Sequence, residues 1–244
     1  MGNAMTNKGR KLLVIGAHSA DFVWRCAGAT AVFTRAGGTA TVIALSYGER
    51  GESGELWKQA GQTEANVKRI RHEEAAAAAA IVGAEFIAMD LGDYPLEIGP
   101  AAMTQLVELI RRMAPDVIVT HADRDPFNPD HGAASAAVQR ARMLSTGSGV
   151  ASAFDIVKPS DLFLFEPHQT EMCGFMPTTY VDITEVFPLK MQAMEAMKAQ
   201  QYLRQHYAER AEHRANQARR ITGSKDIRHA EAFQRVYPQV IDSL

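Results

Sequence analysis

The stretch Leu12-Leu13-Val14-Ile15-Gly16-Ala17-His18-Ser19-Ala20-Asp21 decides the fold. Its residues from Leu12 to Gly16 form a short apolar run, of the kind that is buried on both faces of a parallel sheet. His18 and Asp21 follow directly, one helical turn apart where a helix would begin, so their side chains point the same way. Open α/β sheets bind ligands at this carboxyl edge of their strands. The stretch therefore predicts a buried strand that leads into a binding site.

Outward from this stretch, apolar runs and helical stretches alternate along the chain. Further strands are expected at 39–46, 85–91, 116–121, 161–165 and 180–184. Helices are expected at 22–35, 63–81 and 100–113, in a segment that begins near residue 131, and over the charged stretch 185–220. Residues 221–244 are expected to form a mixed tail. This alternation predicts a sheet with helices on both faces and right-handed crossovers. The expected fold class is α/β: a single Rossmann-like domain over residues 1–244, a three-layer sandwich with a mostly parallel sheet, and residues 1–10 flexible.

Composition and charge limit the classes of function. The chain has 244 residues, 46% of them hydrophobic and 22% charged, and a formal net charge of −2, as in an ordinary globular protein. That charge gives no basic footprint for nucleic acid, and no apolar run approaches the length that crosses a bilayer. Residues 1–10 lack the apolar middle of a secretory signal, and Cys26 and Cys173 have no disulfide or metal spacing. We expect a cytoplasmic homo-oligomer with reduced thiols and no nucleic-acid or membrane partner.

Polar residues gather in the loops that follow four of the expected strands. These loops carry His18 and Asp21, Glu49 and Arg50, the stretch 123–131 and the stretch 166–169. In a parallel sheet all four loops open on the same edge, so their side chains are expected to converge. Two His and one Asp form a sufficient set for catalytic zinc, with the fourth position left for water or substrate. Taken alone, His18 and Asp21 are also compatible with an ordinary helix start.

Three motifs in these loops resemble those of the LmbE-like, or PIG-L, superfamily of zinc-dependent N-deacetylases. They are the strand followed by H-x-x-D, the S-x-G-x-x-G loop of Ser46, Gly48 and Gly51, and the P-D-H helix entry of Pro129, Asp130 and His131. The resemblance runs by motif from Lys11 to Arg140. It implies one Zn²⁺ per chain, or another divalent metal, held by His18, Asp21 and His131.

Two positions depart from the deacetylase pattern. Ala20 stands where the deacetylase motif H-P-D-D has its acid–base Asp, and Asn128 stands where the motif H-P-D-H has its first His. Alanine cannot take a proton, and an amide is no general acid near neutral pH. The ordinary mechanism of amide hydrolysis is therefore not expected. Asn128 and Asp130 are expected to support the site by orienting neighbouring groups.

Longer strings are similar to the 4-oxalomesaconate hydratases, a branch of the same superfamily that acts in bacterial gallate and protocatechuate 4,5-cleavage catabolism. The strings are HSADFVWR from His18, LSYGERGES from Leu45, DPFNPDH from Asp125 and EPHQ from Glu166. The resemblance implies a hydro-lyase that adds water to a small polycarboxylate, 4-oxalomesaconate (4-carboxy-2-hydroxymuconate), to give 4-carboxy-4-hydroxy-2-oxoadipate. It also implies that Glu49 and His168 are the acid–base pair.

Hydration chemistry accounts for this set of groups. Adding water to a double bond conjugated to a carbonyl needs a base for the water, an acid for the carbon and a cation for the developing enolate. Guanidinium groups bind carboxylates in a bidentate way, so Arg25, Arg50 and Arg124 are the candidate substrate ligands. Two alternatives stay open: an N-deacetylase of an N-acetyl sugar conjugate, with Asp130 or Glu49 as its base, and a non-catalytic relative that binds a metal or ligand.

Overall fold

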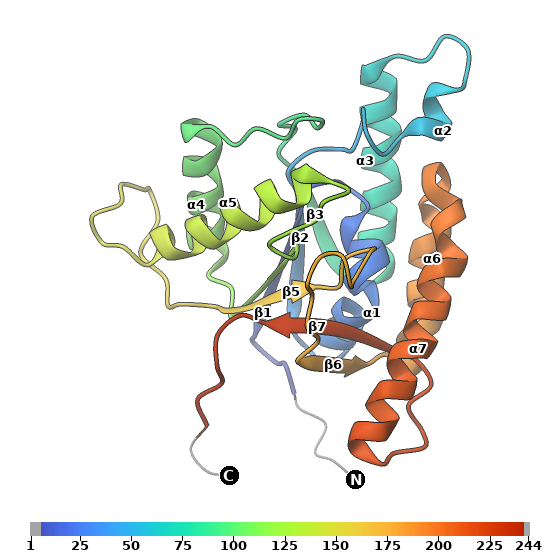
Figure 1. Ribbon diagram of the computed structural model, residues 1–244. Helices are drawn as coiled ribbons and strands as arrows, with labels where there is room; N and C mark the ends of the chain where they lie inside the picture. The colour runs from blue at the N-terminus through green and yellow to red at the C-terminus, as the bar shows by residue number, and fades with distance from the viewer. Residues whose placement is uncertain (1–5, 242–244) are drawn as a thin grey trace.

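The apolar run at the start of the chain forms β1, an inner strand of a seven-stranded sheet. The computed structural model describes residues 6–241, so part of the expected flexible stretch 1–10 lies outside the described residues. The strands lie in the order β3-β2-β1-β4-β5-β7-β6 (Figure 1). Their bounds are β1 Lys11–Gly16, β2 Thr39–Ala44, β3 Ala84–Ala88, β4 Val117–Thr120, β5 Asp161–Phe165, β6 Thr179–Asp182 and β7 Ala230–Arg235.

The sheet is mostly parallel. Neighbouring strands from β3 to β5 run parallel, and β7 runs antiparallel to both β5 and β6. Consecutive apolar residues along β1 point to opposite faces: Leu12 and Val14 enter one apolar cluster, and Leu13 and Ile15 enter the other. Burial on both faces is what a continuous apolar run permits. The predicted α/β class is confirmed.

Helices cover both faces of the sheet and complete three layers. They are α1 Asp21–Arg35, α2 Gly54–Trp57, α3 Glu64–Ile81, α4 Pro100–Met113, α5 Pro129–Ser145, α6 Phe187–Ala196 and α7 Arg204–Thr222, with the 3-10 helices η1 Thr184–Val186 and η2 Lys198–Leu203. One face is covered by α4 and α5, and the other by α1, α3, α6 and α7 (Figure 1). This is the predicted three-layer arrangement.

The strand order places a ligand site at the end of β1. From β1 the chain moves to β2 and β3 on one side, and β4 then returns to the other side of β1. At such a reversal the loops after the two central strands diverge, and ligands bind in the crevice between them. His18 and Asp21 follow β1, and the loop that leads to His131 follows β4.

The C-terminal part differs from the expectation in two respects. Residues 221–244, expected as a mixed tail, contain β7, which lies between β5 and β6. Its core, Ala-Glu-Ala-Phe, is poor in the β-branched residues that favour strands. The charged helical stretch 185–220 is broken into η1, α6, η2 and α7, and the backbone at Gln200 (φ −134°, ψ 31°) is non-helical.

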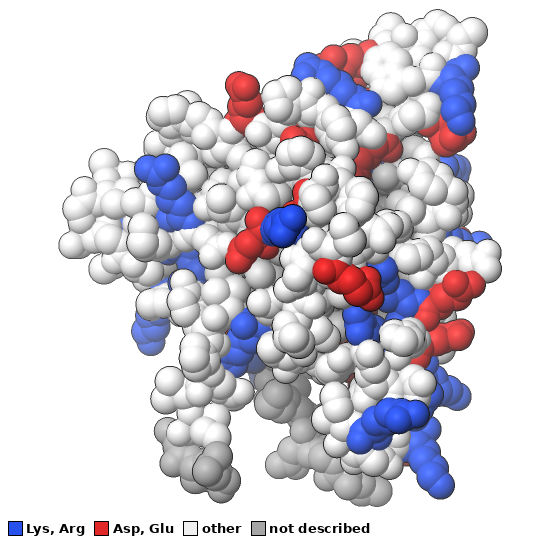
Figure 2. All heavy atoms as spheres, viewed as in Figure 1, with Lys and Arg blue, Asp and Glu red and all other residues white. Residues whose placement is uncertain are grey.

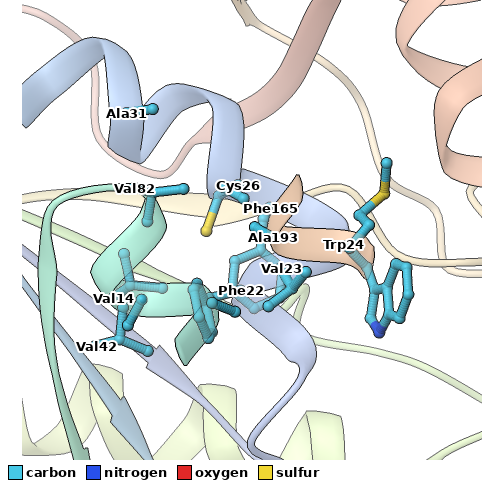
Figure 3. Packing of buried hydrophobic residues seen from close by; sticks show 14 of the residues in the cluster. Val14, Phe22, Val23, Trp24, Cys26, Ala31, Val42, Val82, Phe165 and Ala193 are labelled. Carbon is cyan, nitrogen blue, oxygen red and sulfur yellow. The ribbon is translucent and has the colours of Figure 1, made fainter. Parts of the chain in front are cut away.

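Both cysteines are free and buried. Cys26 lies in the apolar cluster that also contains Val14, Phe22 and Val42 (Figure 3). Burial raises the pKa of the Cys26 thiol far above its usual value, and it raises the pKa of Cys173 to about 11. Each side chain is therefore a neutral thiol near neutral pH, and Cys26 behaves as a small apolar residue.

The surface reflects the nearly balanced charge of the sequence. On the face seen in Figure 2, Lys and Arg side chains lie among Asp and Glu side chains. The described part of this face therefore presents a field of mixed sign. Within residues 6–241, no helix combines the length and the apolar character that crossing a membrane requires.

A buried ion pair ties β7 to the helical layer, and its removal tests that role. Lys190 Nζ lies 2.5 Å from Glu231 Oε1 and donates to the backbone oxygen of Trp24, while Glu231 accepts from the backbone nitrogens of Gly28 and Ala29. Removing one partner leaves an uncompensated buried charge, so Glu231→Leu should lower the free energy of unfolding by about 3 kcal/mol. Denaturant unfolding measures this loss, and the double variant Lys190→Met/Glu231→Leu should lose less than the single variant. A single variant as stable as the wild type would contradict this role.

Candidate metal centre and active site

The turn between β1 and α1 fixes the first two polar side chains of the site. Asp21 begins α1, and its Oδ2 accepts a hydrogen bond of 2.7 Å from the backbone nitrogen of His18. The turn is so tight that a Cβ at Gly16 would lie 2.9 Å from the Cβ of Asp21. Glycine is therefore required where the strand ends, and both side chains are held at the sheet edge, completely buried.

Four side chains converge at this point, and their ligand atoms all lie within 4.8 Å of one another. They are His18 and Asp21 after β1, Glu52 after β2 and His131 in α5. His18 Nδ1 lies 3.2 Å from Glu52 Oε1, and His131 Nε2 lies 3.6 Å from Asp21 Oδ1 and 3.7 Å from Glu52 Oε1. The imidazoles of His18 and His131 and the carboxylate of Asp21 are a donor set suited to a divalent cation such as zinc, and Glu52 adds a second carboxylate beside them.

The buried ring nitrogens show that this donor set fits a metal. His18 Nδ1 and His131 Nε2 are buried without a hydrogen-bond partner, and both face the cluster. The opposite ring nitrogens are held by carboxylates: His18 Nε2 by Asp130 Oδ2 at 3.3 Å, and His131 Nδ1 by Asp125 Oδ2 at 2.8 Å. Carboxylates that orient metal-binding histidines in this way are a regular feature of zinc sites.

The electrostatics of the cluster also favour a cation. Burial lowers the pKa of His18, but the carboxylates of Glu52, Asp130 and Asp21 outweigh burial and raise it well above the usual value. Burial raises the pKa of Glu52, but His18 and His131 outweigh it and hold that pKa well below its usual range. The carboxylates therefore stay ionised and attract positive charge into the cluster.

His121, which sequence reasoning did not single out, completes the surroundings of Asp21. Its Nε2 lies 2.9 Å from both Asp21 Oδ2 and the backbone nitrogen of Ala17, and its ring stacks on His131 at 4.1 Å. Burial lowers the pKa of His121 to about 3, so the ring is neutral. Arg25 donates to the other oxygen, Asp21 Oδ1, at 2.7 Å. The only signal for His121 in the sequence is its place at the end of an apolar run.

A pocket of about 390 Å³ opens beside the cluster. Residues from six separate segments line it, most of them polar, aromatic or charged: Trp24, Arg25, Gly51, Glu52, Tyr94, Asp125, Phe127, Asn128, His131, His168, Gln169, Gln200, Tyr202, Leu203 and Tyr207. The pocket brings His168 and Glu52 to the same space as His131. A small substrate that enters here reaches a carboxylate, an imidazole and the metal-binding cluster together.

Two arginines of α7 fix the loop that carries His168. Arg210 donates to the backbone oxygens of Pro167 and His168, and Arg214 forms a bidentate ion pair with Glu166. Burial lowers the pKa of His168 to about 4, with the nearby His206, Arg25 and Arg210 acting in the same direction. In the free pocket His168 is therefore a neutral imidazole near neutral pH.

The structure does not bring Glu49 into the pocket. Its side chain is completely buried, with Oε1 3.5 Å from Lys68 Nζ and Oε2 accepting from the backbone nitrogen of Tyr47. Burial raises its pKa, as expected for a general base, but the carboxylate faces Lys68. Glu52, three residues further along the same loop, lines the pocket instead. The sequence contains both acids within the string LSYGERGES, and nothing in the string says which one turns inward.

The three candidate arginines differ in their burial and in their position relative to the pocket. Arg25 is buried, lines the pocket, and has its Nε without a hydrogen-bond partner. Arg50 is half-exposed: its Nε lies 3.5 Å from Glu64 and its NH1 donates to the backbone oxygen of Asp93. Arg124 is exposed and is not among the residues that line the pocket. Of the three, only Arg25 can contact a molecule in this pocket without moving its loop.

Asp130 and Asn128, which are expected to orient neighbouring groups, both contact side chains of the cluster. Asp130 holds His18 and accepts from the backbone nitrogens of Tyr94 and Leu96. Burial raises the pKa of Asp130, but these hydrogen bonds outweigh it and lower the pKa to about 2. Asn128 caps the N-terminus of α5, since its side chain accepts from the backbone nitrogen of Asp130, and it donates to Glu52 at 3.2 Å.

Comparison with known proteins agrees with this fold. Residues 13–142 match the family model described as PIG-L: GlcNAc-PI de-N-acetylase. The chain belongs to the PIG-L family. It is 40% identical to the 4-oxalmesaconate hydratase of Pseudomonas putida, over 98% of this chain and 94% of that protein.

Solved structures extend the comparison. The crystal structure of GalB, the 4-carboxy-2-hydroxymuconate hydratase from Pseudomonas putida KT2440, matches with a TM-score of 0.93 and 41% identity, covering 96% of this chain and 99% of that chain. The N,N'-diacetylchitobiose deacetylase from Pyrococcus horikoshii matches with a TM-score of 0.77 and 18% identity, covering 92% and 83% of the two chains. The second likeness shows the shared fold alone.

Metal binding at the cluster predicts a stability change that does not depend on activity. After treatment with a chelator, adding Zn²⁺ at a hundred times its dissociation constant should stabilise the protein by about 2.7 kcal/mol, because only the folded chain assembles the ligands. His131→Ala should lose this effect, while His213→Ala, at an exposed position on α7, should keep it. Thermal unfolding with and without Zn²⁺ measures both. Equal shifts in the two variants would exclude His131 as a ligand.

Proposed function

We propose that this protein is a zinc-dependent hydratase that adds water to 4-oxalomesaconate to give 4-carboxy-4-hydroxy-2-oxoadipate, in the 4,5-cleavage catabolism of gallate or protocatechuate. The observation that carries the proposal is the pocket that joins Glu52 and His168 at the metal-binding cluster. The names of the two Pseudomonas putida relatives support the reaction and the substrate. His18, Asp21 and His131 would hold the metal, which leaves a position open for substrate or water.

Glu52 is the base in this proposal, in place of Glu49. Its carboxylate lies beside His131 in the pocket, where a water molecule can reach it. Glu52 takes a proton from water while the water oxygen bonds to one alkene carbon. A metal held by His18, Asp21 and His131 would supply positive charge for the enolate that develops on the substrate.

His168 is the acid that protonates the second alkene carbon. The pKa of its ring is low in the free pocket because of burial and of the cations around it. A bound polycarboxylate brings negative charge beside the ring and raises that pKa, so the imidazole gains a proton when substrate is present. The electron pair of the double bond then takes this proton, and the sum of the two transfers is the addition of one water.

Substrate binding rests on one guanidinium and several neutral donors. The guanidinium-bearing side chain of Arg25 lines the pocket beside its ion pair with Asp21. Charge-assisted hydrogen bonds from arginine are the strongest that a carboxylate finds in proteins. Tyr94, Tyr202 and Gln169 line the same pocket and offer uncharged polar groups for the remaining oxygens.

The assay of this proposal follows the loss of the conjugated chromophore of 4-oxalomesaconate with the zinc-loaded protein. We expect chelator-sensitive hydration by the wild type. Glu52→Gln and His168→Ala should each lower kcat by about a hundredfold to ten-thousandfold, the usual contribution of a general base or acid. Metal content measured in the same preparations should stay at one Zn²⁺ per chain in His168→Ala. No hydration by the metal-loaded wild type would refute the proposed function.

A matched substitution separates the two acids of the loop. Glu49→Gln makes the same chemical change three residues away, in a side chain that faces Lys68. We expect its loss of kcat to be much smaller than that of Glu52→Gln. A larger loss in Glu49→Gln, in a protein with unchanged thermal unfolding, would return the role of base to Glu49.

The deacetylase alternative predicts a different product. The N,N'-diacetylchitobiose deacetylase shares the fold at 18% identity, and this chain has Ala20, completely buried, between His18 and Asp21. We expect no acetate release from a panel of N-acetylglucosamine conjugates under conditions in which hydration is measured. Acetate release at a comparable rate would favour the alternative.

A further inference from the structure

Two carboxamide side chains from distant parts of the chain hold the two oxygens of Glu52. Asn128 Nδ2 donates to Glu52 Oε1 at 3.2 Å, and Gln200 Nε2 donates to Glu52 Oε2 at 3.4 Å. Asn128 precedes α5 and Gln200 lies in η2, 72 positions later. Both amides are buried and both line the pocket. Each carboxylate oxygen therefore has its own neutral donor.

The orientation of the Gln200 amide is fixed by groups behind it. Its oxygen accepts from Arg71 NH2 at 2.9 Å and from the indole nitrogen of Trp24 at 3.4 Å. An amide oxygen that faces two donors leaves the NH₂ group on the opposite side. Gln200 can therefore present only its donor to Glu52.

The Asn128 amide is fixed in the same way by the start of α5. Its oxygen accepts from the backbone nitrogen of Asp130, as an N-cap residue does. The NH₂ group is then directed away from the helix and toward Glu52. One residue therefore caps α5 and donates to the carboxylate in the pocket.

The segment that carries Gln200 is anchored to α3. Glu74 accepts from the backbone nitrogen of Ala199, and Arg71 is completely buried and pairs with Glu74 at 3.1 Å. The non-helical backbone of Gln200 allows its side chain to reach between Arg71 and Glu52. The position of the amide is therefore set by α3 and not by η2 alone.

We propose that Asn128 and Gln200 are positioning residues that hold Glu52 in the orientation in which it takes a proton from water. The inference rests on the proposed function, because it assigns a purpose to the orientation of the proposed base. A carboxylate with both oxygens held by neutral donors keeps its charge and loses rotational freedom, and that preorganisation is what a general base needs. Arg71 acts one step further back, through Gln200.

Replacing each amide with the acid of the same shape tests the positioning role of Asn128 and Gln200 without removing side-chain volume. Asn128→Asp keeps the oxygen that caps α5, and Gln200→Glu keeps the oxygen that faces Arg71, but each replaces the NH₂ donor with an oxygen that repels Glu52. We expect each variant to lower kcat by about tenfold to a hundredfold, the usual cost of losing a group that orients an active-site residue. KM should change less than kcat, and zinc content and thermal unfolding should stay near those of the wild type. Gln201→Ala is the matched control, because the Gln201 amide donates to backbone oxygens at the end of α6.

The outcomes separate this inference from the proposed function. Hydration by the wild type with unchanged kcat in both acid variants would overturn the positioning role. Crystal structures of the zinc-loaded wild type and Gln200→Glu give a readout without turnover: the wild type should keep both amide contacts to Glu52, and the variant should show the Glu52 carboxylate turned away. A zinc-loaded wild type without these contacts would also overturn the inference. A wild type that keeps these contacts but does not hydrate the substrate would refute the proposed function, while the two amides would still be shown to orient Glu52.

Discussion

The carboxylate of Asp21 is the constraint on which the rest of the structure depends. It is completely buried, it accepts from the backbone of His18 and from Arg25, and its Oδ2 lies 2.9 Å from His121 Nε2; these three groups belong to the β1 turn, α1 and the end of β4. Such a charge is costly to bury unless every lone pair is used. The partners and the facing ring of His131 hold the pKa of Asp21 far below its usual value against the effect of burial. The fold must therefore bring these elements together before the site can form.

Much of the fold could be predicted because its information is local. An apolar run such as Leu12 to Gly16 specifies a strand buried on both faces, and regular alternation with helices specifies the parallel sheet. The strand β7 could not be found in this way. Its apolar residues are alanines with one phenylalanine, and its buried Glu231 is stabilised by Lys190 and by backbone groups of α1. The stability of that strand comes from partners about 40 and 200 positions away, which no local pattern shows.

The same distinction between local sequence patterns and long-range contacts applies to the residues of the site. His18, Asp21 and His131 follow strand ends, and because parallel strands end on one edge, their convergence could be expected from the sequence alone. The choice between Glu49 and Glu52 could not, since both lie on one glycine-rich loop and its path decides which carboxylate turns toward the pocket. The Glu49 carboxylate faces Lys68 of α3, whereas the Glu52 carboxylate faces His18 and His131. His121 and Gln200 were missed because each acts through contacts with residues remote in sequence.

The two departures from the deacetylase motifs have one physical consequence. With Ala20 in the first motif, the protein has no carboxylate at that position, and Glu52 brings one to the cluster from the loop after the neighbouring strand β2. With Asn128 in the second motif, the residue at the start of α5 is neutral and its NH₂ group can only donate to that carboxylate. A histidine there would compete for a proton with Glu52, whereas an amide orients the carboxylate without exchanging a proton with it. In the proposed hydratase, the scaffold therefore keeps its cation site while the base is Glu52, on the loop after β2.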